Sequence, residues 1–290
     1  MTRASRFVLA GLPAAGKTTY LAALWNALEA RELPTELKLL SGPVDKKYLN
    51  EVLSPWHGAT AIGHTSASTE EFIELVLETP EGRHLKVEHA DVSGESFRDM
   101  WEKRAWTPKL REYALHATGT LLFIHPDHVQ VPVRVDEENK ILGRPRGETS
   151  SHNIGPSKPT LAANFDPNKT PTATQLVFIL QELQAASTHL HTPVVIIISA
   201  WDTLESSGKA PKQWLKETLP LLYQYLETNA ETHPYTVFGV SALGGDVTDP
   251  EIRNKLLEQT SAAARVRVVH SGATSNDITK PILWLAKATE

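Results

Sequence analysis

Apolar, β-branched runs alternate with helical periodicities along this chain, and such alternation is typical of a parallel sheet covered by helices on both faces. After the first apolar run and a short loop comes the first helical pattern, at Leu21, Leu24, Trp25 and Leu28. We expect six strands, at residues 6–11, 72–79, 84–90, 119–125, 193–199 and 235–241. The predicted fold class is therefore α/β, with three layers.

One junction in the strand pattern breaks the alternation. Only residues 80–83 (Pro-Glu-Gly-Arg) separate the second and third predicted strands, too few for a crossover helix. These strands must therefore form an antiparallel hairpin, so we expect a mostly parallel sheet with one antiparallel edge strand. A helix at about residues 278–287 is expected outside the sheet, and residues 1–290 are predicted to form a single domain.

The segment from about 126 to 171 is predicted to be a long loop insertion. It contains seven prolines and three glycines, which prevent long regular structure. It follows the fourth predicted strand and emerges at the carboxyl edge of the sheet, where parallel sheets bind their ligands. Two interpretations stay open: a lid or partner-docking element, and a mobile solvated loop.

The composition narrows the class of protein. With 290 residues, 41% of them hydrophobic and 22% charged, the chain has ample material for a core. A net charge of −5 lacks the basic surplus of a nucleic-acid surface, so nucleic acid is a disfavoured partner. No apolar run reaches about 18 residues and no signal-like stretch precedes the first strand, so we expect no membrane span and a cytoplasmic location. Zero cysteines exclude disulfides and cysteine nucleophiles.

Residues 11–18 (Gly-Leu-Pro-Ala-Ala-Gly-Lys-Thr) carry the strongest chemical signal. They fit the pattern G-x-x-x-x-G-K-[ST] between an apolar strand and a helix, which is the context of a phosphate-binding loop. Such glycines let backbone N–H groups converge on phosphates at the positive end of the helix. Lys17 would neutralise the β- and γ-phosphates, and Thr18 would offer its hydroxyl to Mg²⁺. The expected nucleotide-binding residues are Gly11, Pro13, Ala14, Ala15, Gly16, Lys17, Thr18 and Thr19.

A second phosphate-site element follows the predicted hairpin, at residues 91–95 (Asp-Val-Ser-Gly-Glu). A carboxylate at the carboxyl end of a strand beside the phosphate loop can hold Mg²⁺ through water, so Asp91 is a metal candidate. The Gly94 amide can approach the γ-phosphate. The alternative is that Asp91 and Gly94 only form the turn that starts the next helix.

With these motifs in this order, the chain resembles the P-loop GTPases of the translation-factor-related (TRAFAC) class. The apolar strand at 194–198 ends in Ser199-Ala200-Trp201-Asp202, where that class usually carries N-K-x-D, and Ser241-Ala242 stands where it carries S-A-[KL]. The resemblance implies that Asp202, Ser241 and Ala242 bind the base. Asp202 can accept two hydrogen bonds from guanine that adenine does not offer, which favours GTP. The asparagine that braces the loop and the lysine that packs along the base are absent.

More narrowly, residues 11–25, 199–202 and 277–285 resemble the bacterial double-GTPase families. Their members resemble components of conflict or defence operons, in which one such GTPase is encoded beside a second. The resemblance implies a regulatory role, with a second GTPase, an effector or another copy of the chain as partner.

Two mechanistic residues are expected around the γ-phosphate. The polar stretch 63–69 is correctly placed for a switch loop, so Thr65, or alternatively Thr69, is a candidate to sense Mg²⁺. Turn chemistry before a strand explains either threonine equally well. Glu95 stands where many relatives place a glutamine that orients the attacking water. A glutamate there can accept the proton of the water, or it can repel the γ-phosphate and leave hydrolysis slow; we expect slow hydrolysis. Lys17, Gly94 and Glu95 are the expected catalytic residues.

Three classes of function are compatible with these residues. The leading one is a GTP-binding switch that hydrolyses GTP slowly and changes its partner surface through segments 57–70 and 91–104. In the second, an ATP-using or nucleotide-locked structural subunit, Ser199 and Ala200 signal that base selection was lost. A small-molecule kinase is disfavoured because no second basic cluster is present to clamp an acceptor. His125 and His128 resemble a metal pair only superficially, since Pro126 prevents helical presentation and no third ligand is apparent.

Overall fold

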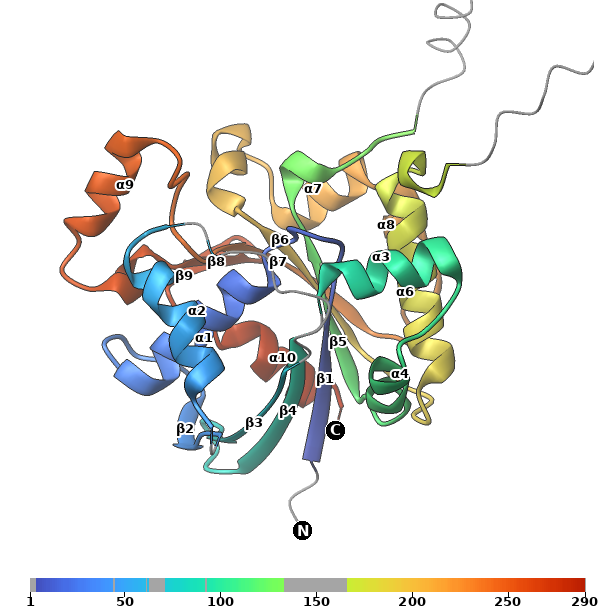
Figure 1. Cartoon of the computed structure of the whole chain (residues 1–290), viewed down its shortest axis with the longest axis horizontal. Coiled ribbons are helices and arrows are strands. Elements are labelled where there is room, and N and C mark those ends of the chain that lie inside the picture. The colour runs from blue at the N-terminus through green and yellow to red at the C-terminus, as the bar shows by residue number, and fades with distance from the viewer. Residues whose placement is uncertain are drawn as a thin grey trace, which may run out of the picture.

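The computed structural model describes residues 4–43, 45–60, 62, 71–91, 93–132 and 166–289. Within these residues, nine strands form one sheet in the order β2-β3-β4-β1-β5-β6-β7-β8-β9 (Figure 1). The strands are Ala4–Ala10 (β1), Lys38–Ser41 (β2), Glu71–Glu78 (β3), His84–Asp91 (β4), Gly119–Ile124 (β5), Val194–Ser199 (β6), Tyr235–Ser241 (β7), Arg267–His270 (β8) and Ala273–Ser275 (β9). All six expected strands are present. The prediction of a single domain stays a prediction.

The centre of the sheet is parallel, as predicted. Strands β4, β1, β5, β6 and β7 run in one direction, which confirms the mostly parallel α/β fold. Strand β3 pairs antiparallel with β4, as the short connection at residues 80–83 requires. The sheet continues past both expected edges, however, because β2 pairs with β3, and β8 and β9 extend it beyond β7, all antiparallel.

The expectation of a single antiparallel edge strand is therefore wrong in detail. Strand β3 is an inner strand, and β8 is a second strand that opposes the parallel set. The additional strands β2, β8 and β9 have four, four and three residues. So few residues show no readable alternation of apolar and polar positions, which explains why the sequence pattern does not predict them.

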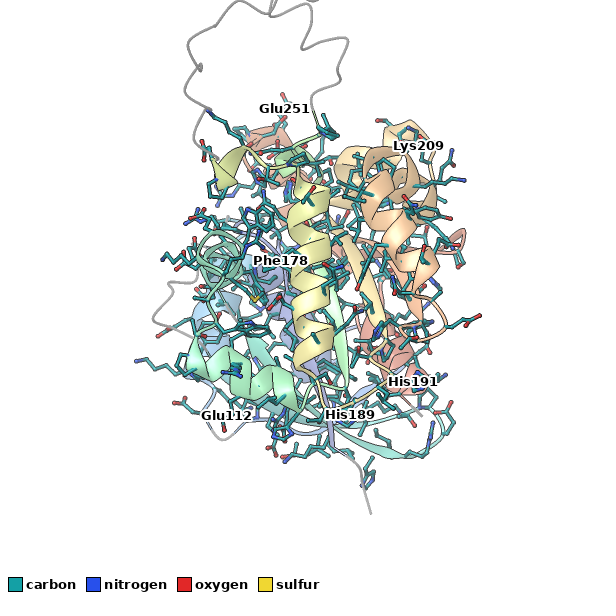
Figure 2. All side chains as sticks on the ribbon, turned by 90° about the vertical axis from the view of Figure 1, so that its right-hand side faces the viewer. Glu112, Phe178, His189, His191, Lys209 and Glu251 are labelled. Atoms are coloured by element: carbon teal, nitrogen blue, oxygen red, sulfur yellow. The ribbon has the colours of Figure 1, made fainter. Side chains whose placement is uncertain are left out.

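Helices cover both faces of the sheet. They are Lys17–Ala30 (α1), Lys47–His57 (α2), Gly94–Lys103 (α3), Pro108–Leu115 (α4), Thr172–Ala186 (α6), Pro211–Thr218 (α7), Pro220–Thr228 (α8), Pro250–Leu257 (α9) and Lys280–Ala288 (α10). Four short 3₁₀ turns are described as well: Pro126–His128 (η1), Pro167–Lys169 (η2), Trp201–Ser207 (η3) and Ala262–Arg265 (η4). Figure 2 shows α6 between α4 on one side and α7 and α8 on the other. Helix α10 confirms the predicted C-terminal helix.

The two cores lie on opposite faces because successive strand residues point to opposite sides. In β1, Phe7 and Leu9 pack with α1, α2 and α10, whereas Val8 and Ala10 pack with α3, α4 and α6. Strands β5 and β6 are buried along their whole length, which explains their continuous apolar runs. None of the helices in the described part of the chain has both the length and the apolar character of a membrane crossing.

The two ends of the predicted insertion lie side by side. The backbone N–H of Thr172 donates to the Gln130 carbonyl (2.9 Å), and the Gln130 N–H donates to Thr172 Oγ1 (2.9 Å). Residues 133–165, which contain most of the predicted insertion, lie outside the described residues. The segment after β5 and the start of α6 are therefore hydrogen-bonded neighbours.

Candidate functional site

The predicted phosphate loop joins β1 to α1 at the carboxyl edge of the sheet, where β1 lies between β4 and β5. Gly11 and Gly16 both adopt positive φ angles, 151° and 90°. A Cβ on Gly11 would lie 2.8 Å from the Phe123 carbonyl oxygen, and one on Gly16 would lie 2.9 Å from Ser199 Cβ. The two glycines therefore let the loop approach β5 and β6 closely.

Lys17 lies beneath this loop. Its side chain is only 5% exposed, and its ammonium donates hydrogen bonds to the carbonyl oxygens of Gly11 (2.9 Å) and Leu12 (3.3 Å). The same ammonium lies 5.9 Å from the centre of the Phe97 ring, which belongs to α3. A buried positive charge is thus fixed between the loop and the second predicted phosphate element.

A cavity of 200 Å³ brings the two phosphate elements together. Residues 13–19 form one wall and Ser93, Gly94 and Glu95 form the other. A Cβ on Gly94 would lie 2.4 Å from both Cα and N of Pro13, so the start of α3 is pressed against the loop. Because the first turns of α1 and α3 both line this cavity, two helix N-termini favour an anion there.

Of the other two metal candidates, the structure describes the backbone of Asp91, whereas Thr65 lies outside the described residues. Asp91 ends β4, and its backbone pairs with Leu9 of β1, next to the phosphate loop. Ser93 is the N-cap of α3, since its Oγ accepts a hydrogen bond from the Ser96 N–H (3.2 Å). Helix α3 thus begins at Gly94, as the helix-start interpretation expects, with Ser93 as its cap, while Asp91 is the last residue of β4.

A second cavity, of 370 Å³, adjoins the first. Ser199, Ala200, Asp202 and Thr203 line it on one side, with Ala242 and residues 245–248 opposite. The two cavities share a boundary formed by Gly16, Thr19, His125 and Leu243. The geometry suits a nucleotide with its phosphates in the smaller cavity and its base in the larger one.

Two contacts fix the loop that carries Asp202. Trp201 is 2% exposed and packs on Gly239, where a Cβ would lie 2.4 Å from Cδ2 of the indole. The Asp202 backbone N–H donates to Ser241 Oγ (2.7 Å), and Ala200 turns the chain with a φ of 45°. The structure thus places Ser241 behind the loop, where it holds Asp202, while Ala242 lines the cavity.

Ser199 occupies the place of the missing asparagine. Its Cβ is close to Gly16, and its hydroxyl donates to the Ile124 carbonyl oxygen (3.3 Å). His125 also lines the smaller cavity, and no sequence motif identified it as a nucleotide-site residue. It directly follows β5, a neighbour of β1, and parallel sheets bind their ligands at the carboxyl ends of the strands. Its position was therefore the only available signal.

The end of α2 is attached to the wall of the larger cavity. The Trp56 indole N–H donates to the Ala242 carbonyl (2.9 Å), and Arg265 donates to the Trp56 carbonyl (3.0 Å). Arg253 donates to the carbonyls of Ala59 (3.1 Å) and Gly58 (3.2 Å). We call these side chains, Trp56, Arg253 and Arg265, the α2 brace. Two cations at the C-terminus of α2 also suit its dipole.

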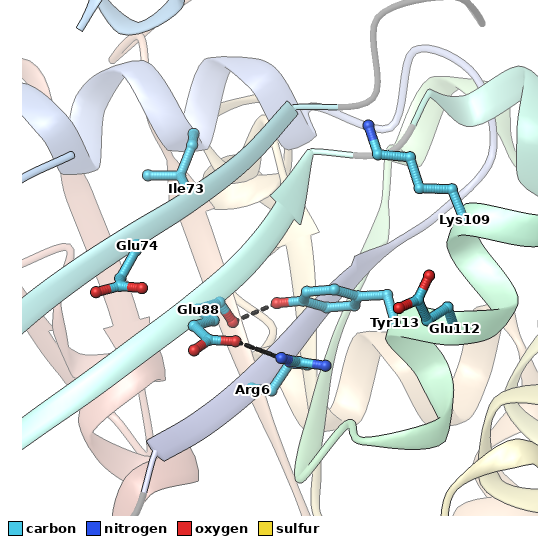
Figure 3. A pocket seen from close by; sticks show the side chains of 7 residues that line it. All are labelled: Arg6, Ile73, Glu74, Glu88, Lys109, Glu112 and Tyr113. Atoms are coloured by element: carbon cyan, nitrogen blue, oxygen red, sulfur yellow. Dashed lines mark hydrogen bonds and ion pairs between the residues drawn. The ribbon is translucent and has the colours of Figure 1, made fainter. Parts of the chain in front are cut away.

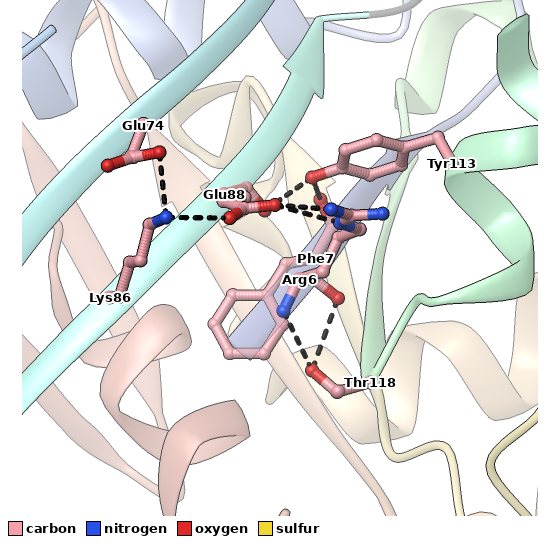
Figure 4. Close-up of polar contacts among 7 residues, drawn as sticks. All are labelled: Arg6, Phe7, Glu74, Lys86, Glu88, Tyr113 and Thr118. Carbon is pink, nitrogen blue, oxygen red and sulfur yellow. Dashed lines mark hydrogen bonds and ion pairs between the residues drawn. The ribbon is translucent and has the colours of Figure 1, made fainter. Parts of the chain in front are cut away.

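A third cavity, of 420 Å³, lies between α4 and the strands β1, β3 and β4 (Figure 3). Arg6 and Lys86 both pair with Glu88, at 2.6 Å and 3.1 Å, and Lys86 also pairs with Glu74 at 2.9 Å (Figure 4). Burial opposes ionisation of Glu88, but hydrogen bonds from Arg6 and Lys86 outweigh it and lower its pKa. Tyr113 adds a hydrogen bond to the Glu88 carbonyl. The four charges on the strands neutralise one another, and Tyr113 connects the strands to α4.

Among the described residues, no group of three or more His, Asp or Glu side chains is placed to hold a metal ion. The expected metal ligands at the phosphate cavity stay Thr18, Asp91 and Thr65, together with oxygens of the bound nucleotide.

Comparison with known families agrees with this geometry. The family model described as Double-GTPase 1 matches residues 8–285. A comparison with curated proteins finds no sequence that matches. The match covers the phosphate loop, the Asp91–Glu95 element and the Asp202 loop, so it includes both cavities. Because it also covers almost the entire chain, the chain belongs to the Double-GTPase 1 family of GTP-binding GTPases.

Proposed function

We propose that this GTPase is a nucleotide-controlled switch for a partner protein and that it hydrolyses GTP slowly with Mg²⁺. The observation that carries the proposal is the pair of adjoining cavities, of 200 and 370 Å³. The start of α3 lines the first, and the α2 brace reaches the wall of the second. Both expected switch segments thus reach the smaller cavity, 57–70 through Ile62 and 91–104 through the start of α3, and the larger cavity is attached to the end of α2.

The residues of the smaller cavity fit a triphosphate with Mg²⁺. Lys17 supplies a fixed charge, the α1 and α3 N-termini supply N–H donors, and Thr18 lines the cavity. Mg²⁺, when bound, stabilises negative charge on the phosphate oxygens. Under this proposal Thr18, Asp91 and Thr65 hold the metal, and Gly94 meets the γ-phosphate.

Glu95 accounts for the proposed slow turnover. Its half-buried side chain lines the phosphate cavity, beside Gly94. A carboxylate there orients the attacking water as an acceptor, but it also places a negative charge next to the γ-phosphate, whose charge catalysis must stabilise. GTP would therefore be held longer than in an enzyme with a neutral glutamine.

We propose as partner a second GTPase, an effector, or another copy of this chain, in a cytoplasmic, conflict-related bacterial system. The support is the membership of a double-GTPase family and its resemblance to defence components. The described ends of the insertion, at Gln130 and Thr172, lie where β5 leaves the nucleotide edge. This position supports a docking or lid role for residues 126–171.

One observation favours a second candidate, an ATP-using or nucleotide-locked subunit. The described wall of the larger cavity contains no lysine or arginine, and Ala200 supplies only a methyl group where a base-packing lysine is usual. Base selection would then rest on Asp202 with little support.

A thermal-shift titration tests the proposal. The ligands are GDP, a non-hydrolysable GTP analogue, ADP and an ATP analogue, each with and without Mg²⁺. A nucleotide at 100 times its Kd adds about 2.7 kcal/mol, or about 5–10 °C for a chain of this size. We expect this shift only for guanine nucleotides with Mg²⁺, and we expect Lys17→Ala to abolish it. Lys47→Ala is the matched control, because its side chain is 80% exposed on α2.

Equal stabilisation by adenine nucleotides would support the nucleotide-locked subunit. The absence of a shift with every nucleotide would contradict the nucleotide site.

A further inference from the structure

His125 occupies the boundary between the two cavities. It follows β5, begins the η1 turn, and lines both cavities together with Gly16, Thr19 and Leu243. A nucleotide that fills both cavities must cross this boundary with the part that joins its phosphates to its sugar. Of the boundary residues that the structure describes, His125 alone carries an ionisable group.

The ring of His125 presents a hydrogen-bond donor. The Asp127 backbone N–H donates to its Nδ1 (3.3 Å), so the neutral imidazole carries its proton on Nε2. In the described part of the chain, no protein group forms a hydrogen bond with Nε2. A donor is therefore available at the boundary, where phosphate and sugar oxygens are acceptors.

Burial, assisted by His128, favours the neutral form of the His125 ring. Burial lowers its pKa, and His128, whose ring centre lies 4.7 Å away, lowers it further, while Asp127 and Asp202 act in the opposite direction. Lys17 and Glu95 line the same smaller cavity. A neutral ring donates through Nε2 without prior protonation, so this contact is formed at physiological pH.

We infer that His125 is a nucleotide-binding residue whose Nε2–H donates a hydrogen bond to the ligand where its phosphates meet its sugar. The inference rests on the proposed nucleotide site. His125 thereby gives the larger cavity, which we call the base-side cavity, a polar contact that Ala200 does not provide. His125 does not distinguish guanine from adenine nucleotides, because the phosphate–sugar junction is the same in GDP and ADP.

Calorimetric titration of the full chain with GDP and Mg²⁺ tests this inference. His125→Ala should weaken GDP binding by about tenfold, as expected for the loss of one hydrogen bond to a charged group. His125→Gln keeps an N–H donor and should bind within about threefold of the unsubstituted chain. His128→Ala is the matched control, because His128 belongs to the same turn but lines neither cavity.

A parallel titration with 2′-deoxy-GDP tests where on the ligand the contact lies, because this ligand lacks only a hydroxyl that is remote from the phosphate–sugar junction. We expect His125→Ala to weaken GDP and 2′-deoxy-GDP by the same factor. A loss that occurs with GDP but not with 2′-deoxy-GDP overturns the inference, since the contact would then be to the 2′-hydroxyl.

GDP binding that His125→Ala leaves unchanged overturns the inference and leaves the proposed function intact. Equal weakening by His125→Ala and His128→Ala also overturns it, because the effect would then belong to the whole turn. Failure of the unsubstituted chain to bind any nucleotide overturns both the inference and the proposed function.

Discussion

Replacing Gly239 with alanine should damage guanine recognition more than phosphate binding. Gly239 lies in β7, two residues before Ser241, and its missing side chain leaves room for the Trp201 indole. The added Cβ would lie 2.4 Å from Cδ2 and 2.5 Å from Cγ of that ring. Carbon atoms in contact lie about 3.5–4.0 Å apart, so the ring or the strand must move by roughly 1 Å.

The loss of stability in Gly239→Ala depends on whether the Trp201 indole has space to move into. Trp201 is only 2% exposed and is part of the core between the sheet and α6, so it has no open space to enter. Overpacking of this kind costs about 1–3 kcal/mol. Because Trp201 precedes Asp202, its displacement also strains the 2.7 Å hydrogen bond from the Asp202 N–H to Ser241. We therefore expect Gly239→Ala to lower the GDP affinity at least tenfold while ADP affinity falls less.

Urea unfolding and GDP and ADP titrations measure these two effects. Gly58→Ala is the control, because the nearest atom to its added Cβ would lie 3.6 Å away and its φ of −71° is ordinary. We expect the control to change stability by less than about 0.5 kcal/mol. The reasoning is refuted if Gly239→Ala unfolds at the same urea concentration as the unsubstituted chain, or if GDP and ADP lose affinity equally.

Three further substitutions address other parts of the molecule. Glu95→Gln should raise single-turnover GTP hydrolysis about tenfold; an unchanged or lower rate would contradict the proposed repulsion. Glu88→Gln should cost about 1–2 kcal/mol in urea unfolding at pH 7. The pKa of Glu88 is lowered in the folded state, so its ionised side chain stabilises the fold above the pKa of the unfolded chain, and this stabilisation disappears as pH falls through the folded pKa. A stability difference between the variant and the unsubstituted chain that stays constant down to acid pH would disprove this. Trp56→Phe removes the bond to Ala242, should cost about 1 kcal/mol, and should speed GDP release in stopped-flow displacement; unchanged release would separate the α2 brace from the base-side cavity.

Periodic and motif-bearing parts of the chain were predictable because their physical signals are local. Long apolar strands and the phosphate loop fall in this class, and the loop lies at the predicted edge of the sheet. The α2 brace was not predictable, since its hydrogen bonds join residues 186, 209 and 195 positions apart without any repeating pattern. The same applies to Ser241, whose motif indicated base binding but not its bond to the Asp202 backbone.

The α2 brace also restricts how the neighbouring segment can respond to a ligand. Carbonyl oxygens at residues 56, 58 and 59 are all engaged by arginines from the C-terminal part of the chain, and Arg265 is 3% exposed. Under the proposed function, occupation of the base-side cavity stabilises this attachment in the GDP-bound and GTP-bound states alike. Within this segment, a difference between those two states must then arise beyond Ala59, so a partner that distinguishes them has to read that part of the segment or the start of α3 rather than the end of α2.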